Sequence, residues 1–284
     1  MALQFDPIPV DQLHDLIVKG LRSFFKKAGC ENAVLGLSGG IDSAVVAALA
    51  VEAFGKDHVT GIMMPSQYST LHSISDAVDL ANNLGIRYYV APIEKIYDKL
   101  LKVVTPFFEG NHRWDTTQEN LQARIRATIL MAYANRRKAL LLNTTNKSEL
   151  SMGYGTLYGD LAGALMVIAD VYKLQVYDLA NYINLAKDVV PRSTISKAPS
   201  AELAVGQKDT DTLPPYSELD PILYSLNEAG MSPEKLIENG VDQKLVDRIL
   251  KIRARNGFKT IQVPPVLKIS SHPLLEASKC FEIE

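Results

Sequence analysis

Cysteine is scarce in this chain. Its 284 residues include only two cysteines, Cys30 and Cys280. They lie far apart and form no C-x-x-C pair, so neither a disulfide framework nor a zinc site is expected. This composition fits a protein of the reducing cytoplasm.

Long apolar runs and an excess of one charge are absent as well. No apolar run approaches the roughly 18 residues that cross a bilayer, and residues 1–9 lack the basic region and apolar core of a signal peptide. The 30 Lys and Arg residues nearly balance the 32 Asp and Glu residues, which gives a formal net charge of −2. The sequence therefore predicts neither a nucleic acid nor a membrane as partner.

What the chain has instead is a regular alternation of strand and helix patterns. Short apolar runs alternate with helical periodicity, which is typical of a parallel sheet covered by helices. The expected strands are 33–37, 58–64, 86–90, 139–142 and 165–170, and the expected helices are 11–28, 41–54, 69–84, 93–104, 117–138 and 172–185. Further helices at 219–226, 232–238 and 242–256 predict a helical C-terminal part. The predicted fold class is α/β, a twisted parallel sheet with helices on both faces in a single domain, 1–284.

Three stretches lack regular periodicity. Residues 107–115 are expected to form an irregular turn, and regular structure is expected to end at Pro264 and Pro265. Residues 190–215 are rich in Pro, Ser, Thr and Asp. A loop of that length in a compact domain is usually a functional lid or a disordered segment.

The turn after the first predicted strand carries the most specific pattern. The sequence Ser-Gly-Gly-Ile-Asp-Ser at 38–43 joins a strand to a helix, which points backbone N–H groups at a bound anion. No lysine follows the glycines and there is no G-x-G-x-x-G, so this is neither a P-loop nor a dinucleotide-binding turn. Asp42 would repel a phosphate unless a cation lay between them, and we therefore expect it to bind Mg²⁺. An ordinary glycine turn is the alternative.

Other polar residues follow later strands, at the edge where such sheets bind ligands. Residues 64–69 are candidate adenosine contacts by position, and Thr144 is a candidate phosphate or ribose contact. Glu149 is a candidate second Mg²⁺ ligand, with a simple helix cap as the alternative. Lys173 opens a helix, where a cation opposes the helix dipole unless it meets a phosphate; an exposed lysine is the alternative.

One helix face carries a further candidate pair. Asn120 and Arg124 are four residues apart and so lie on the same face of the predicted helix 117–138. They either bind a ligand or belong to a solvated helix face with an ion pair.

These motifs together resemble a known family. The loop at 38–43 is similar to the pyrophosphate loop of the N-type ATP pyrophosphatases, which split ATP between its α and β phosphates. With the later segments, the chain resembles the NAD synthetases. The loop is shared with GMP and asparagine synthetases and tRNA-modifying relatives, whereas residues 143–149 and 197–203 single out NAD synthetase. The matching segments are Ser38-Gly-Gly-Ile-Asp-Ser43, Glu119-Asn-Leu-Gln-Ala-Arg124, Leu157-Tyr-Gly-Asp160, Tyr172-Lys-Leu-Gln175, Asn143-Thr-Thr-Asn-Lys-Ser-Glu149 and Lys197-Ala-Pro-Ser-Ala-Glu-Leu203.

The resemblance implies an adenine nucleotide alpha hydrolase-like, Rossmann-like fold and an ATP-dependent amidation of deamido-NAD. The nicotinate carboxylate would attack the α-phosphate of ATP, and ammonia would then displace AMP. The implied catalytic residues are Ser38, Asp42, Ser43 and Lys173. The implied ATP contacts are Gly36, Leu37, Ser38, Gly39, Gly40, Ile41, Asp42, Ser43, Thr144, Lys173 and Ser200. The implied deamido-NAD contacts are Asn120, Arg124 and Lys259, and the implied Mg²⁺ ligands are Asp42 and Glu149.

The resemblance also bears on the nitrogen donor. Many ammonia-using members have a lysine and an aspartate where this chain has Leu157 and Ala164, and a His-Lys pair that is missing around 260–262. At these places the sequence is more similar to the synthetase domain of glutamine-using enzymes. Those enzymes carry a nitrilase-like domain before this region, but only about 30 residues precede the first strand here, and neither cysteine has the context of an amidotransferase nucleophile. We therefore expect no glutaminase domain, and free ammonia or a separate glutaminase subunit as the source.

The family implies a homodimer whose dinucleotide site lies across the interface, with the helix around 119–137 as a contributor. Two other hypotheses stay open. A tRNA-modifying ATP pyrophosphatase would have a basic face or a zinc-binding tail. A non-catalytic nucleotide-binding module would not need Asp42 and Glu149 as a metal pair.

Overall fold

The centre of the molecule is a parallel sheet of seven strands. The computed structural model describes residue 3, residues 5–110 and residues 113–283. The strand order is β3-β2-β1-β4-β5-β6-β7, and every neighbouring pair is parallel. The strands are β1 (Asn32–Gly36), β2 (Val59–Met63), β3 (Arg87–Val90), β4 (Ala139–Asn143), β5 (Leu165–Met166), β6 (Val266–Leu267) and β7 (Cys280–Phe281).

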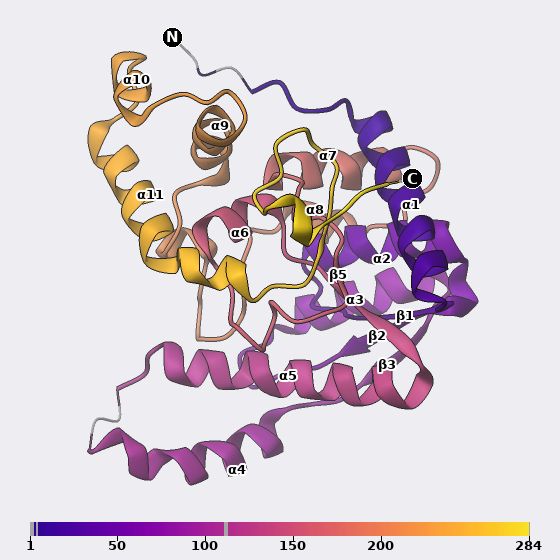
Figure 1. Cartoon of the computed structure of the whole chain (residues 1–284). Helices are drawn as coiled ribbons and strands as arrows, with labels where there is room; N and C mark the ends of the chain where they lie inside the picture. Colours follow the sequence, from indigo (N-terminus) through magenta and orange to yellow (C-terminus); the bar gives the residue numbers. More distant parts are fainter. Residues whose placement is uncertain (1–2, 4, 111–112, 284) are drawn as a thin grey trace.

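Helices cover both faces of this sheet (Figure 1). One face packs against α1 (Val10–Ala28), α2 (Ile41–Phe54), α3 (Leu71–Leu84) and α7 (Lys173–Ile183) in the largest apolar cluster of the described chain. The other face packs against α4 (Glu94–Val104) and α5 (Thr116–Arg137). Because α2 is apolar around most of its circumference, it lies buried between the sheet, α1 and α7.

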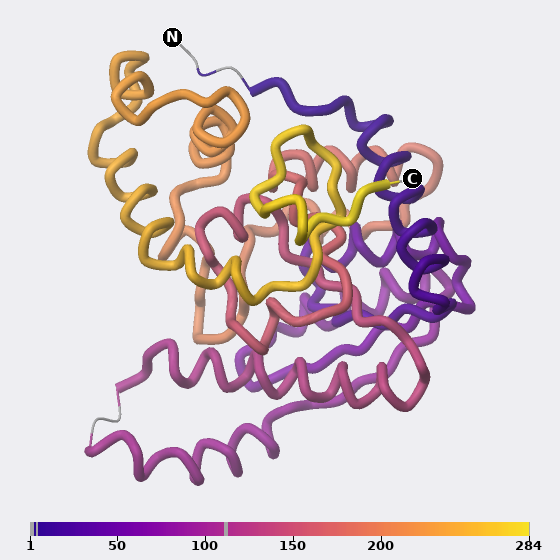
Figure 2. The backbone as a smooth tube through the Cα atoms, viewed as in Figure 1, coloured from indigo at the N-terminus to yellow at the C-terminus, as the bar shows by residue number. Residues whose placement is uncertain are grey.

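A separate apolar cluster holds the helical part. It joins α6 (Lys147–Met152) to α9 (Tyr216–Asn227), α10 (Pro233–Glu238) and α11 (Gln243–Asn256). In Figure 2 these later helices form their own lobe beside the sheet, and the chain then returns to the sheet. That return places β6 next to β5, and β7 next to β6 at the edge of the sheet. Short turns of helix complete the structure: η1 (Lys56–His58), η2 (Thr105–Phe108), η3 (Asp209–Asp211), η4 (Gly257–Ile261), η5 (Ala277–Lys279) and α8 (Arg192–Ser196).

The order of strands creates the binding position. The chain runs from β1 outward to β2 and β3, then crosses to the other side of β1 to form β4. In an open parallel sheet, the crevice beyond the carboxyl ends of two strands at such a reversal is where ligands bind. The glycine loop follows β1, and the polar segment 143–149 follows β4. Both therefore meet at this crevice.

The predicted α/β class, the first four strands and the main helices are confirmed. Three expectations were wrong in detail. Regular structure does not end at Pro264 and Pro265, because β6 and β7 follow and extend the sheet. The fifth strand is two residues long rather than 165–170, and residues 190–215 contain α8 and η3. Within the predicted turn at 107–115, residues 111–112 lie outside the described residues, and so do residues 1, 2 and 4 of the N-terminal segment 1–9.

None of the described helices combines the length and the apolarity that a bilayer crossing requires.

Candidate active site

A cavity of about 290 Å³ lies at the crevice between β1 and β4. Its floor is the glycine loop and the end of β4, and one wall comes from α5. Segment 197–203, which follows α8, forms another wall. The cavity thus gathers residues from distant parts of the chain around the predicted anion site.

The glycine loop has the conformation of an anion cradle. Gly39 has φ +78°, and a Cβ there would overlap the carbonyl of Ser73, so only glycine fits. Ser43 Oγ lies 3.1 Å from Ser38 Oγ and donates to the carbonyl of Gly40. The two predicted catalytic hydroxyls therefore face each other at the start of α2.

Asp42 and Lys173 form an ion pair at this loop. Lys173 Nζ lies 2.5 Å from Asp42 Oδ2, and only 2% of the lysine side chain is exposed. The alternative of an exposed lysine is therefore wrong. Burial opposes the charge of Lys173, but the carboxylates of Asp42 and Glu149 outweigh it and raise the lysine pKa. The ammonium group is consequently charged at any physiological pH.

Asn146 connects the two proposed metal ligands. Its Nδ2 donates to Asp42 Oδ1 at 2.9 Å. It also caps α6 reciprocally with Glu149, because each residue's side chain accepts from the other's backbone N–H. The helix-cap interpretation of Glu149 is thus correct as local structure, and the same cap turns Glu149 toward Asp42 and the cavity.

The site carries more negative than positive charge. Burial raises the pKa of Glu149 well above its usual range, and the neighbouring Asp42 raises it further. Burial also raises the pKa of Asp209, whose carboxylate accepts from the hydroxyls of Tyr154 and Tyr216. Three carboxylates therefore surround one ammonium group, that of Lys173.

This donor set fits a divalent cation held together with phosphate. Mg²⁺ prefers oxygen ligands and commonly binds one or two carboxylates plus substrate phosphates rather than a full protein cage. Asp42 and Glu149 supply two such carboxylates. Over the described ranges, no group of three or more His, Cys, Asp or Glu side chains is arranged to hold a metal by itself. The remaining ligands would have to come from phosphate or water.

The structure brings most of the predicted ATP contacts together. The predicted residues that line the cavity are Gly36, Leu37, Ser38, Gly40, Ile41, Asp42, Ser43, Thr144, Lys173 and Ser200, together with the metal candidate Glu149. Gly39 lies behind this surface, against α3. Met64, Pro65 and Ser69, from the predicted adenosine loop, also line the cavity.

The three predicted deamido-NAD contacts lie outside the cavity lining, around one loop. Asn120 Oδ1 accepts from Thr156, and Arg124 Nε donates to the carbonyl of Leu157. Lys259 Nζ donates to the carbonyls of Gly153 and Gly155 at 2.7 and 2.8 Å. The structure thus groups all three on segment 153–157, beside the ATP contacts but not among them. The alternative interpretation, a solvated face of α5 with an ion pair, finds no ion pair of Arg124 with any described residue.

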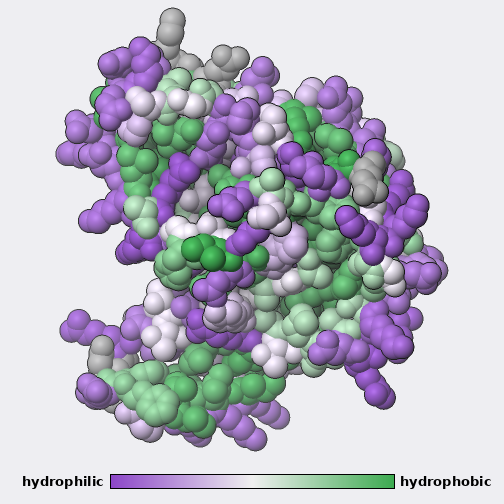
Figure 3. Space-filling view, in the orientation of Figure 1, coloured by the Kyte–Doolittle hydropathy of each residue, from purple (hydrophilic) through white to green (hydrophobic). Residues whose placement is uncertain are grey.

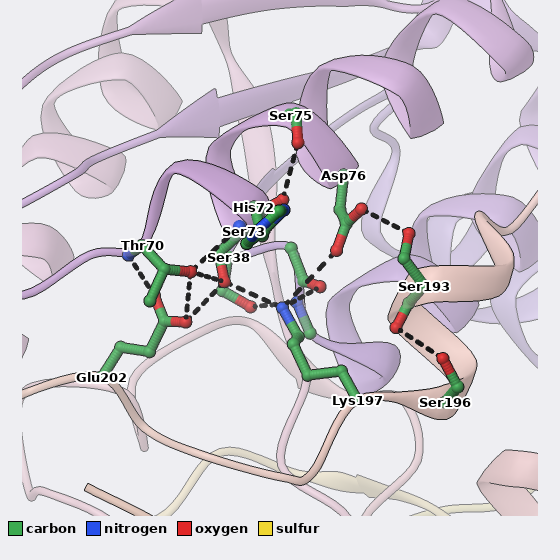
Figure 4. A network of polar contacts seen from close by, with 12 residues as sticks. Ser38, Thr70, His72, Ser73, Ser75, Asp76, Ser193, Ser196, Lys197 and Glu202 are labelled. Atoms are coloured by element: carbon green, nitrogen blue, oxygen red, sulfur yellow. Dashed lines mark hydrogen bonds and ion pairs between the residues drawn. The ribbon is translucent and has the colours of Figure 1, made fainter. Parts of the chain in front are cut away.

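Five charged residues of this site had no role assigned from the sequence. Arg126, Asp160, Lys197, Glu202 and Asp209 line the cavity. Arg126 is mostly buried, which lowers its pKa to about 10, and it makes no ion pair within the described chain. Lys197 and Glu202 lie inside a segment that carried the family resemblance, but their contacts with α3, drawn in Figure 4, join residues more than 100 positions apart.

Fold and site together define a nucleotide-binding α/β protein with an anion loop at the sheet reversal. The sequence pattern of the NAD synthase family matches residues 13–263. The chain belongs to the NAD synthase family.

Individual relatives agree with this assignment. A glutamine-dependent NAD(+) synthetase of Synechocystis sp. (strain ATCC 27184 / PCC 6803 / Kazusa) is 46% identical over 263 residues, which are 93% of this chain and 47% of the relative. The chain thus spans about half the length of the curated relatives it matches first.

Two solved structures match over their whole length. The NMN synthetase of Francisella tularensis is 30% identical with a TM-score of 0.77, covering 95% of this chain and 100% of that one. The NH3-dependent NAD synthetase of Campylobacter jejuni subsp. jejuni NCTC 11168, in complex with nitrate, is 30% identical with a TM-score of 0.71, covering 92% and 100%.

Proposed function

We propose that the protein catalyses the ATP-dependent amidation of deamido-NAD to NAD through an adenylated carboxylate, releasing AMP and pyrophosphate. The observation that carries this proposal is the convergence of the glycine loop, the Asp42–Lys173 pair and Glu149 on one cavity at the sheet reversal. Membership of the NAD synthase family supports the substrate. A site of this kind stabilises the negative charge that moves onto the leaving pyrophosphate.

Each residue has a role in that reaction. The N–H groups and hydroxyls of the glycine loop bind the leaving phosphates, and Lys173, which is paired with Asp42 beside the loop, offsets their charge. Asp42 and Glu149 would hold Mg²⁺, which when bound would neutralise phosphate charge. Asn146 holds both carboxylates, because its Nδ2 donates to Asp42 and its backbone N–H donates to Glu149. Thr144 and Ser200 lie on the cavity wall where they would orient ATP. Asn120, Arg124 and Lys259 would bind deamido-NAD next to segment 153–157.

The nitrogen donor follows from the same proposal. We propose that the synthetase site itself accepts ammonia, whether that ammonia is free or is delivered by a glutaminase. The Campylobacter relative is named an NH3-dependent enzyme, and the Synechocystis relative a glutamine-dependent one. Turnover with ammonium but not with glutamine would support direct use of ammonia by this chain without glutaminase activity of its own, and turnover with glutamine would refute that. Adding a glutaminase to the glutamine assay tests delivery by a separate subunit.

A shorter acceptor is a second candidate. The Francisella structure, named an NMN synthetase, matches along its entire length. Its acceptor would share the nicotinate carboxylate of deamido-NAD but lack the AMP half. Comparing kcat/KM for nicotinic acid mononucleotide and for deamido-NAD distinguishes the two substrates.

We also propose a homodimer that covers an apolar face of α4, η2 and α5. Large apolar side chains are exposed there, with Phe107 at 75% and Val103 at 64%. Figure 3 shows apolar surface gathered over these helices, at the lower left. Exposed apolar area of this kind marks an association surface. Light scattering should give the mass of a dimer for the wild type and a monomer for Val103→Glu; a monomeric wild type would refute this part.

The activity itself is tested by incubating the chain with ATP, Mg²⁺, ammonium and deamido-NAD and measuring pyrophosphate. Release that depends on deamido-NAD is expected. Release without an acceptor, or with tRNA in its place, would favour another ATP pyrophosphatase. No release of any kind would favour a nucleotide-binding module without catalysis.

A further inference from the structure

The peptide between Gly39 and Gly40 is held in its orientation by Lys197, a residue of the cavity wall that contacts the carbonyl of Gly39. The carbonyl of Gly39 accepts a hydrogen bond from Lys197 Nζ at 3.0 Å. In a trans peptide the following N–H points the opposite way. The N–H of Gly40 accordingly points toward the loop interior, where it donates to Ser38 Oγ at 3.1 Å. This is the direction in which an anion cradle must present its amide groups.

Two adjacent glycines do not hold this orientation by themselves. Glycine adopts positive and negative φ almost equally well, so a Gly-Gly peptide can rotate with little steric cost. If it rotated, the carbonyl oxygen of Gly39 would face the phosphates and repel them. A contact that holds the carbonyl outward therefore favours anion binding without touching the anion.

Lys197 is itself held by α3. Its Nζ donates to Ser73 Oγ at 2.8 Å and lies 3.7 Å from Asp76 Oδ2. Asp76 is 5% exposed, and its Oδ2 accepts no hydrogen bond from any described residue. The ammonium group of Lys197 is therefore the only charge that compensates this buried oxygen among the contacts of the described chain. Figure 4 shows the side chain of Lys197 extending toward Ser73 and Asp76 of α3, and Ser193 of α8 contacting Asp76.

Other contacts keep Asp76 and Ser73 in place. Ser193 Oγ donates to the second oxygen of Asp76 at 2.6 Å. Glu202 accepts from Ser73 Oγ at 2.5 Å and from the N–H of Thr70, which caps α3. These hydrogen bonds from α3 and from residues 193–202 therefore hold the partners of the Lys197 ammonium group in position.

We propose that Lys197 is a positioning residue that sets the Gly39–Gly40 peptide for pyrophosphate binding, and that Asp76 positions Lys197 in turn. The inference rests on the proposed function, because it takes the glycine loop to be the pyrophosphate site. Both lysines line the cavity, but Lys173 is paired with Asp42, whereas the inference assigns to Lys197 an action through the backbone carbonyl of Gly39.

The test compares Lys197→Met with the wild type and with Lys187→Met, which removes an exposed lysine of the preceding loop. Calorimetry with Mg²⁺ and inorganic pyrophosphate should show affinity at least tenfold weaker for Lys197→Met, and unchanged for the control. Lys197→Arg should recover part of the affinity, because a guanidinium group can still donate to the carbonyl. Asp76→Asn should weaken binding in the same direction by a smaller factor.

A second measurement separates positioning from direct phosphate contact. The amide resonance of Gly40, observed without ligand in ¹⁵N-labelled protein, should shift in Lys197→Met and stay unchanged in Lys187→Met. Weaker pyrophosphate binding with an unshifted Gly40 resonance would overturn the positioning role, because Lys197 would then act on the phosphate itself. Equal pyrophosphate affinity in Lys197→Met and wild type, or no pyrophosphate binding by the wild type, would also overturn the inference.

Failure of the proposed function gives a different result: the wild type would bind pyrophosphate but release none from ATP with deamido-NAD.

Discussion

Lys173 Nζ and Asp42 Oδ2, which lie 131 positions apart in the sequence, are separated by 2.5 Å. The pair joins the start of α7 to the start of α2 directly below the glycine loop. Asp42 also accepts from Asn146, so a single carboxylate connects the three segments that follow β1, β4 and β5. The arrangement keeps a positive charge at the loop while leaving Glu149 without an ion pair among the described residues.

Asp42→Asn should abolish deamido-NAD-dependent pyrophosphate release, with a loss of at least about 100-fold. The amide retains the shape of the side chain but removes a metal ligand and the partner of Lys173, in a site where electrostatic stabilisation is usually the largest contribution. Circular dichroism should show an intact fold. Asp79→Asn, which changes an exposed acid on α3, serves as the control and should retain wild-type turnover. Full activity in Asp42→Asn would contradict the metal role.

Glu149→Gln should raise the Mg²⁺ concentration needed for half-maximal turnover by about 10-fold or more, since second carboxylate ligands contribute strongly to binding. The raised pKa of Glu149 gives a further expectation. At any pH where this carboxyl is partly protonated, Mg²⁺ binding displaces its proton, so metal binding should release protons and should weaken as the pH falls. Calorimetry in buffers of different ionisation enthalpy measures that release. Glu218→Gln, an exposed acid on α9, is the control, and equal proton release in both variants would argue against Glu149.

Lys147→Met should destabilise the protein by about 3–5 kcal/mol. The ammonium group of Lys147 is fully buried between Asp170 and Glu228, at 2.8 Å from each. Methionine fills the space but leaves two carboxylates unpaired, one of them buried. Urea unfolding measures the loss. Lys235→Met is the control, because its ion pair with Glu238 is exposed and should contribute less than about 1 kcal/mol.

Asp220 should make stability depend on pH. Burial raises its pKa to about 6, although Ser148 and the N–H of Leu174 donate to it and oppose the shift. The folded state therefore binds this proton more tightly than the unfolded state, where the pKa is about 3.8. The resulting stabilisation is complete at low pH and is lost as the pH rises through about 6.

The corresponding experiment measures the free energy of unfolding at pH 5 and pH 7.5. The wild type should gain about 1 kcal/mol from Asp220 at the lower pH. Asp220→Asn should lack this gain, whereas Asp247→Asn, an exposed acid on α11, should retain it. An identical pH dependence in wild type and Asp220→Asn would contradict the raised pKa.

The local sequence was sufficient to predict those elements whose apolar pattern and hydrogen-bond partners lie close together along the chain. The apolar strand, glycine turn and apolar helix at 33–54 predicted β1, the loop and α2, because each depends on short-range periodicity and on glycine geometry. The capping residues of α6 were visible in the same way, since Asn146 and Glu149 are three residues apart. The strands β6 and β7 were missed because two residues carry no periodicity. They exist only through tertiary pairing, of β6 with β5 and of β7 with β6.

The sequence by itself determined that this chain forms a parallel α/β sheet with a glycine loop after its first strand, because both follow from local apolar spacing and backbone freedom. Tertiary structure alone decided which charges meet at that loop. Lys173 could have been solvated, but burial against Asp42 made it an ion pair. Lys197 had no assigned role until the packing of α8 on α3 brought its ammonium group to the carbonyl of Gly39. Electrostatic interactions between side chains depend on the distance between them in space. That distance cannot be read from the number of residues that separate them in the sequence.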